Sequence, residues 1–142
     1  MGVQTVLAKY GLSSPSDVSE SVMFPWREVS EASVVEKGPG RPPHWEMVFG
    51  GLGSLISARA IIAGCLLPEN TNSGKFLKAI GVRGNRKSAH NNSPFYKFEG
   101  VRLLDPFAGY GSIPLEAMRT GIDAIAVELL PTAYVFLKAL LD

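Results

Sequence analysis

Cysteine and histidine are scarce in this sequence. Cys65 is the single cysteine among 142 residues, and the two histidines, His44 and His90, are far apart. One cysteine excludes an internal disulfide and any multi-cysteine zinc site. Neither histidine has a second ligand at metal-binding spacing. We therefore expect no bound metal, and the low cysteine content is typical of a reducing, cytoplasmic environment.

The sequence also lacks an excess of charge and a long hydrophobic run. The net charge of +1 says nothing about partners. The most apolar stretch, residues 52–67, carries Arg59 and is too short to span a bilayer. The first residues do not have the pattern of a signal peptide. With 46% hydrophobic residues, the chain is expected to be a soluble globular protein of one domain's length.

The first 99 residues predict a helical and irregular segment. Residues 23–43 are broken by proline and glycine and predict an ordered but irregular arm. The run LISARAIIAGCLL (55–67) predicts a buried helix, and Pro68 ends it. Residues 70–98 hold six basic residues and no acidic one. They predict a basic loop with a helical turn at FLKAIG (76–81).

Residues 100–142 predict a β-α-β-α unit. VRLLD (101–105) and AIAVE (124–128) are short apolar strands. SIPLEAMRT (112–120) and PTAYVFLKALLD (131–142) are helices, each with a proline near its start. Alternation of strands and helices favours an α/β fold with a Rossmann-like, doubly wound parallel sheet.

A glycine turn, DPFAGYGS, joins the first strand to the first helix. Gly109 and Gly111 leave room for a ligand near the positive end of that helix. Asp105 ends the first strand, where its carboxylate can accept hydrogen bonds from an ammonium group but would repel a phosphate. Glu128 ends the second strand, in position to hold the hydroxyls of a ribose.

These residues favour one cofactor over others. A dinucleotide-binding loop needs a third glycine where this chain has Pro114, and no G-K-[ST] phosphate loop is present. A nucleoside with a charged amino-acid tail, S-adenosylmethionine, fits better than a pyrophosphate. The alternative is that the glycines form an ordinary turn and the two acids only end a strand or start a helix.

The turn resembles motif I, D-P-F-x-G-x-G, of the amino-group methyltransferases that act on nucleic acids. DPFAGYGSIPLEAMRTG, AIAVELLPTAYVFLKALLD and the upstream FPWREVSEASVVEK are similar to the prokaryotic adenine-specific DNA methylase-like family, over about residues 22–68 and 100–142. The resemblance implies a methyltransferase that uses S-adenosylmethionine, with DNA favoured over RNA as its substrate. It implies cofactor contacts by Asp105, Pro106, Phe107, Gly109, Gly111 and Glu128.

Three departures from the family stand out. Tyr110 replaces a small residue, and glycines 50, 51 and 53 stand where tryptophan and basic residues are usual. The second motif, [D/N/S]-P-P-[Y/F/W], which holds the target amine, is missing. NSPFY (92–96) resembles it only loosely and is better interpreted as a turn before the first strand.

We therefore expect an N-terminal part of such an enzyme with little or no turnover alone. Two alternatives remain: one subunit of a split methyltransferase completed by a second chain, and a non-catalytic remnant that binds cofactor or nucleic acid. The basic stretch offers Arg83, Arg86 and Lys87 as candidate phosphate contacts, with Phe95, Tyr96 and Phe98 near them for base stacking. A solvated loop is the competing interpretation.

Overall fold

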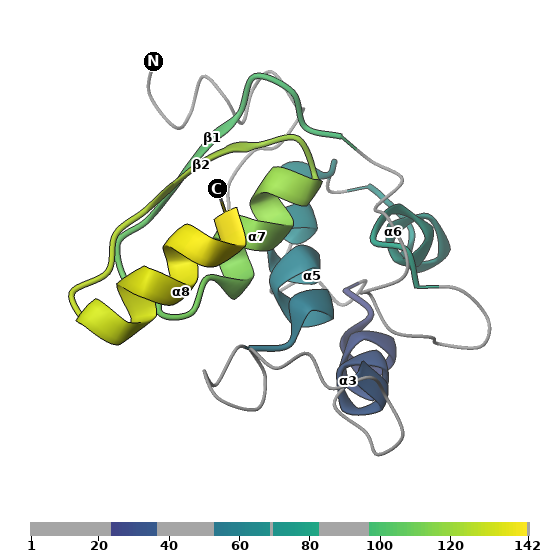
Figure 1. The fold of residues 1–142 in the computed structure, drawn as a ribbon. Helices are drawn as coiled ribbons and strands as arrows, with labels where there is room; N and C mark the ends of the chain where they lie inside the picture. Colours follow the sequence, from purple (N-terminus) through teal and green to yellow (C-terminus); the bar gives the residue numbers. More distant parts are fainter. Residues whose placement is uncertain (1–23, 37–52, 69, 83–96, 142) are drawn as a thin grey trace.

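The computed structural model describes residues 24–36, 53–68, 70–82 and 97–141 (Figure 1). This part of the chain is a mixed α/β structure, as expected. In chain order its elements are α3 (Trp26–Glu36), α5 (Leu55–Leu66), α6 (Ser73–Ala79), β1 (Arg102–Asp105), α7 (Ser112–Arg119), β2 (Asp123–Ala126) and α8 (Pro131–Leu141). None of these helices is both long and apolar enough to cross a membrane.

The sheet of the described region has two parallel strands. Arg102 lies opposite Asp123, and Asp105 lies opposite Ala126. Helix α7 makes the connection between β1 and β2 and packs against both strands. Figure 1 shows α7 and α8 on the same, inner side of the strands. The expected β-α-β-α order is therefore confirmed, while helices on both faces of a doubly wound sheet are not seen within the described ranges.

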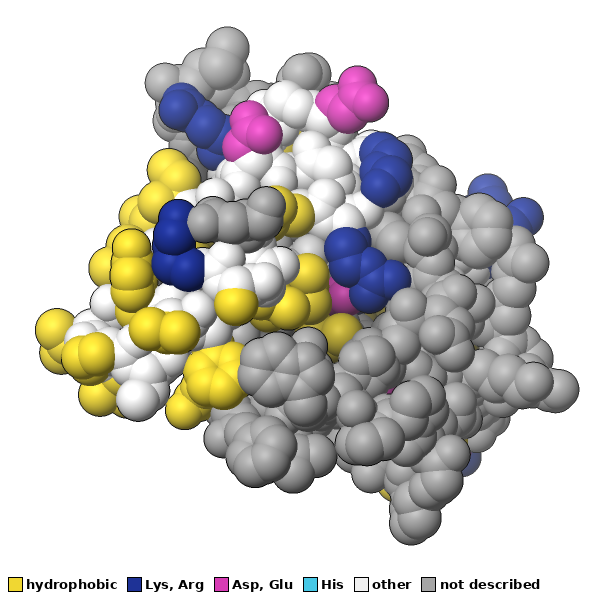
Figure 2. Space-filling model, in the orientation of Figure 1, with side chains coloured by type: hydrophobic (Ala, Val, Ile, Leu, Met, Phe, Trp, Pro, Cys, Tyr) yellow, Lys and Arg dark blue, Asp and Glu magenta, His cyan; other side chains and the backbone are white. Residues whose placement is uncertain are grey.

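The other side of the two strands, here called the outer face, is exposed; it carries Arg102 and Asp123 where the strands begin and apolar side chains toward their carboxyl ends. Leu104 of β1 is 63% exposed, Ile125 of β2 is 54% exposed, and Val127 just beyond β2 is 50% exposed. Figure 2 shows apolar side chains gathered along this side of the molecule. Parallel strands are normally covered on both faces. The outer face therefore has the composition of a surface that packs against another layer.

Helix α5 is the centre of the core. It is apolar on nearly every side and packs against α3 and α7. The Oγ atom of Ser54 accepts a hydrogen bond from the amide of Ser57 at 3.3 Å and so caps the helix, which ends just before Pro68. The predicted buried helix is therefore confirmed. Phe98 and Val101 belong to the same core cluster, so the packing continues without a break into the β-α-β-α unit.

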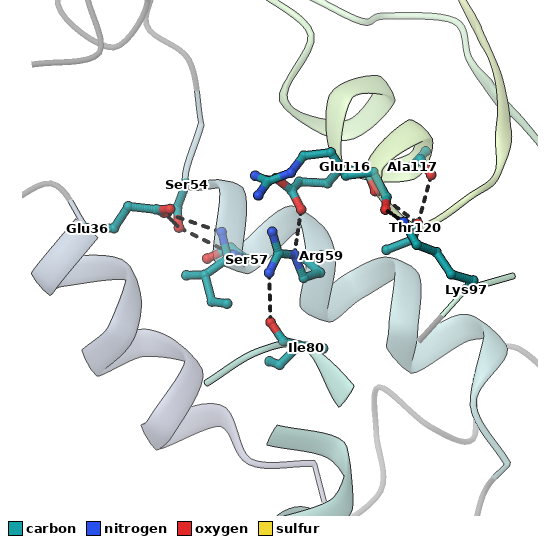
Figure 3. Close-up of polar contacts among 11 residues, drawn as sticks. Glu36, Ser54, Ser57, Arg59, Ile80, Lys97, Glu116, Ala117 and Thr120 are labelled. Atoms are coloured by element: carbon teal, nitrogen blue, oxygen red, sulfur yellow. Dashed lines mark hydrogen bonds and ion pairs between the residues drawn. The ribbon is translucent and has the colours of Figure 1, made fainter. Parts of the chain in front are cut away.

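A buried ion pair joins α5 to α7 (Figure 3). The Nε atom of Arg59 lies 2.5 Å from Oε2 of Glu116, and both side chains are fully buried. Arg59 also donates to the carbonyl of Ile80 at 2.9 Å, just beyond α6. Arg119 binds the other oxygen of Glu116 at 2.8 Å. One carboxylate and one guanidinium thus connect α5, α7 and the end of α6.

The structure differs from the sequence prediction in two helices. The arm predicted to be irregular contains α3, which buries Val29, Ala32 and Glu36 on one face. Its Glu36 accepts hydrogen bonds from the Ser54 hydroxyl at 2.8 Å and the Ile56 amide at 3.3 Å. Tertiary contacts of this kind outweigh a weak local pattern.

Helix α6 lies where a basic loop with a single helical turn was expected. It begins at Ser73 because the side chain of Asn72 caps it, accepting from the Lys75 amide at 2.9 Å. Asparagine is among the most favourable residues at this capping position. The Asn-Ser pair before FLKA was therefore a start signal that the sequence prediction did not use.

Replacing Arg59 tests the buried ion pair. Arg59→Met leaves the buried carboxylate of Glu116 without its fully buried partner, although Arg119 still contacts it, so the free energy of unfolding should fall by about 3–5 kcal/mol. The control Arg27→Met changes an exposed arginine on α3 and should cost less than about 0.5 kcal/mol. Urea denaturation measures both values. Equal losses in the two variants would show that the pair does not hold the layers together.

Candidate functional site

The glycine turn, residues 106–111, is held at the carboxyl ends of both strands by hydrogen bonds that its backbone amides donate. The Oδ1 atom of Asp105 accepts from the Phe107 amide at 3.1 Å. The Ala108 amide donates to the Val127 carbonyl at 3.0 Å, and the Gly111 amide donates to the Ala108 carbonyl at 2.9 Å. The turn therefore has a defined position relative to the end of β2.

Glu128 is the side chain that ties the turn to the start of α8. Its Oε2 atom accepts from the Gly109 amide at 2.7 Å. Its Oε1 atom accepts from the amides of Leu129 and Leu130, each at 2.8 Å. The Leu130 hydrogen bond is the largest cause of the lowered pKa of Glu128, because amide donors stabilise the charged carboxylate. Desolvation comes next and raises the pKa, and the weaker Gly109 and Leu129 bonds again lower it.

Asp105 and Glu128 lie on the same side of the sheet. Asp105 is paired with Ala126, and side chains alternate along a strand, so Glu128 two residues later points to the side of Asp105. Both residues are half-buried, whereas Val127 between Ala126 and Glu128 is exposed on the outer face. The carboxyl ends of β1 and β2 thus present two carboxylates around one turn.

The two glycines of the turn have different surroundings. Both have positive φ, +54° at Gly109 and +92° at Gly111, which favours glycine at each position. A Cβ at Gly109 would meet nothing within 4 Å, so the turn is open there. A Cβ at Gly111 would lie 2.7 Å from Cδ2 of Leu137, so Gly111 makes room for α8. Only Gly109 therefore faces space that a ligand can fill.

The amino end of α7 completes the site. The helix begins at Ser112, and Gly111 before it has no side chain to cap it. The first amides of a helix have no partner within the helix, and they carry a partial positive charge. Pro114 lies in this first turn, as predicted. A Cβ at Gly53 would lie 3.1 Å from the Ser112 hydroxyl, so the segment before α5 passes close to the site.

Apolar side chains flank the turn. Phe107 is 90% exposed and Leu129 is 92% exposed, so neither belongs to the core. The family resemblance implies a cofactor contact for Phe107, whereas nothing in the sequence pattern singled out Leu129, whose exposure is known only from the structure. Tyr110 packs its ring against Phe136 at 5.2 Å between centroids. Its side chain therefore contacts α8 and leaves the open side of the turn free.

The predicted nucleic-acid contacts are mostly outside the described residues. Arg83, Arg86 and Lys87, the NSPFY segment and both histidines all belong to ranges that the structure does not describe. Phe98 is described and is buried in the core, so it is not available for base stacking. Lys97 donates to the Arg119 carbonyl and so holds the start of β1 against the end of α7.

Metal ligands and the single cysteine are the remaining candidates for chemistry in the described residues. Among residues 24–36, 53–68, 70–82 and 97–141, no group of three side chains is arranged to hold a metal ion. Cys65 is half-buried on α5, and burial raises the pKa of its thiol. A raised pKa keeps the sulfur protonated and a poor nucleophile at neutral pH.

The lowered pKa of Glu128 gives a test of its contacts. A carboxyl whose pKa is lower in the folded state stabilises the fold above its unfolded pKa, about 4.3, and loses this effect as the pH falls through the folded value. Glu128→Gln should therefore melt at a lower temperature than the parent protein at pH 7, and the gap should narrow below about pH 4. A gap that stays constant across this range would contradict the three amide contacts. Thermal melts at several pH values measure it.

Comparison with protein-family models, with curated proteins and with solved structures finds no match for this chain. What the site can bind must therefore be argued from the geometry of the glycine turn and of the two carboxylates around it.

Proposed function

We propose that the glycine turn binds S-adenosylmethionine and that the chain is part of a Rossmann-like methyltransferase. The observation that carries this proposal is the placement of Asp105 and Glu128 on one side of the sheet, with the open Gly109 between them. In open α/β sheets, ligands bind at the carboxyl ends of the strands. Two carboxylates at this place favour a cationic nucleoside and disfavour a phosphate.

Each part of the cofactor has a suitable partner. The carboxylate of Asp105 is suited to the ammonium of the methionine tail. The tail's carboxylate suits the first amides of α7, because most turn amides are already bonded to the chain's own oxygens. The exposed side chains of Phe107 and Leu129 offer apolar surface for the adenine ring. The bound cofactor would supply an electrophilic methyl group on its sulfonium.

Glu128 limits how the ribose is held. A carboxylate has about four acceptor positions, and three of them are taken by the amides of Gly109, Leu129 and Leu130. One position, on Oε2, is left for a hydroxyl. Glu128 can therefore hold one ribose hydroxyl without changing its own contacts, and holding both hydroxyls requires the release of an amide.

The proposed reaction is methyl transfer to an amino group of a nucleic acid, with adenine in DNA as the favoured target. This part rests on the resemblance of DPFAGYGS to motif I. No [D/N/S]-P-P-[Y/F/W] motif occurs in the 142 residues, so no side chain is assigned to the target amine. The described residues supply cofactor binding only, and we expect the chain alone to transfer little or no methyl group.

Calorimetry with S-adenosylmethionine and S-adenosylhomocysteine tests the cofactor proposal. Asp105→Asn and Glu128→Gln should each weaken binding by about tenfold, because each removes a charged acceptor. The control Asp123→Asn changes an exposed acid at the opposite end of β2 and should bind like the parent. Absence of binding by the parent protein, or equal weakening by the control, would contradict the proposal.

The exposed apolar side chains of the outer face support the alternative that a second polypeptide completes a split methyltransferase. We infer that Leu104, Ile125 and Val127 pack against helices of another chain, because parallel strands rarely leave one face in water.

Placing a charge on the outer face tests whether this face binds a second chain or is exposed to solvent. Co-purification should yield a second chain that bears the Pro-Pro-aromatic motif, and Ile125→Glu should release it. Val34→Glu, at a more exposed apolar position on α3, should not release it. A parent protein that stays monomeric and binds no such chain would contradict the inference. Sedimentation velocity with mass spectrometry of any bound chain gives the answer.

A further inference from the structure

A second concave site lies between the end of α5 and the helix α6. This hollow has a volume of about 470 Å³. Its apolar surface comes from Leu67, Pro68 and Ala79. Pockets of 300–1,000 Å³ with apolar walls and a few polar groups are typical of small-ligand sites. Figure 1 shows α6 at the opposite end of the molecule from the glycine turn, so this is a separate site.

Among the described residues that line the hollow, the polar groups are cationic or neutral. Lys75 and Lys78 lie three residues apart on α6, which places both on one face of that helix, and both are exposed. Within the described ranges, neither lysine forms an ion pair. Asn70 and Thr71 add a side-chain amide and a hydroxyl to the lining. Residues 70–98 contain no acidic residue; Glu69 lies directly before this range and Glu99 directly after it.

We propose that this hollow binds one nucleotide of a single-stranded nucleic acid. The two ammonium groups contact phosphate oxygens, and the base lies against Pro68 and Ala79 at the mouth of the hollow. Single strands are usually bound by cationic side chains along the phosphate backbone together with aromatic rings on which the bases stack. In this hollow, aliphatic side chains offer the apolar surface for the base. An anionic group without an apolar body would leave the largest part of this lining unused.

The hollow identifies which basic residues of the stretch 70–98 contact the nucleic acid. Of the basic residues in 70–98 that the structure describes, Lys97 is bonded to the Arg119 carbonyl, whereas Lys75 and Lys78 face the hollow. This inference deepens the proposed nucleic-acid substrate but does not depend on cofactor binding. It places an anchoring contact on α6, away from the carboxyl ends of β1 and β2.

Fluorescence anisotropy with a short labelled single-stranded DNA tests the proposal. Lys75→Glu/Lys78→Glu should weaken binding at least about tenfold, and the slope of log affinity against log salt should fall by about 1.4, since each phosphate contact contributes about 0.7. Measurements between about 50 and 200 mM salt give the slope. Lys75→Gln/Lys78→Gln should show the same slope change with a smaller loss of affinity.

The control Arg27→Glu/Lys138→Glu makes the same change in net charge on α3 and α8. It should change affinity by less than about threefold and leave the salt slope unaltered. Equal weakening by the two double variants, or an unchanged slope in the lysine variant, would overturn the proposal. All variants alter exposed residues, and matching melting temperatures would verify that they fold.

Competition distinguishes a nucleotide site from a phosphate site. Adenosine monophosphate should displace the labelled strand about fivefold better than inorganic phosphate at equal ionic strength, because its base uses the apolar surface. Equal competition would overturn the placement of the base. S-adenosylhomocysteine binding should be unchanged in the lysine variant, and DNA binding should be unchanged in Glu128→Gln. Failure at one site is therefore distinguishable from failure at the other.

Discussion

The ion pair between Arg59 on α5 and Glu116 on α7 joins the helices α3, α5 and α6 to the β-α-β-α unit. Burying these charges is costly, and their contacts with the Ile80 carbonyl and with Arg119 are what compensate for the lost water. The pair sets the position of α7 against α5, and α7 begins directly after the glycine turn. The geometry of the candidate cofactor site therefore depends on packing in the helical layer as well as on the strands that carry its acids.

Glu128 gives the turn its second anchor. Bonds from three amides hold this carboxylate in place, so it enters binding already oriented, and little ordering is needed when a ligand arrives. The same bonds leave few acceptor positions for the ligand. Gly111 serves packing against Leu137, while Gly109 leaves open space beside Glu128. One side of the turn is thus structural and the other side is available for a cofactor.

The sequence predicted the parts that depend on local pattern. Strand and helix periodicity placed β1, α7, β2, α8 and α5, and the alternation of side chains was enough to bring Asp105 and Glu128 to one edge. Long-range contacts were not predictable in this way. Arg59 and Glu116 are 57 residues apart, and α3 is held by bonds from Glu36 to the start of α5. The role of Gly111 depends on Leu137, which a motif in the turn does not reveal.

The apolar outer face and the hollow beside α6 extend this account to a larger assembly and to a nucleic-acid strand, but the cofactor remains its centre. Amide chemical shifts, followed by NMR during addition of S-adenosylhomocysteine, test cofactor binding at the level of single residues. Binding at the turn predicts that the largest shift changes occur at the amides of Gly109, Ser112 and Leu129, with little change on α3 or α6. Saturable changes elsewhere, or none at these three amides, would contradict it.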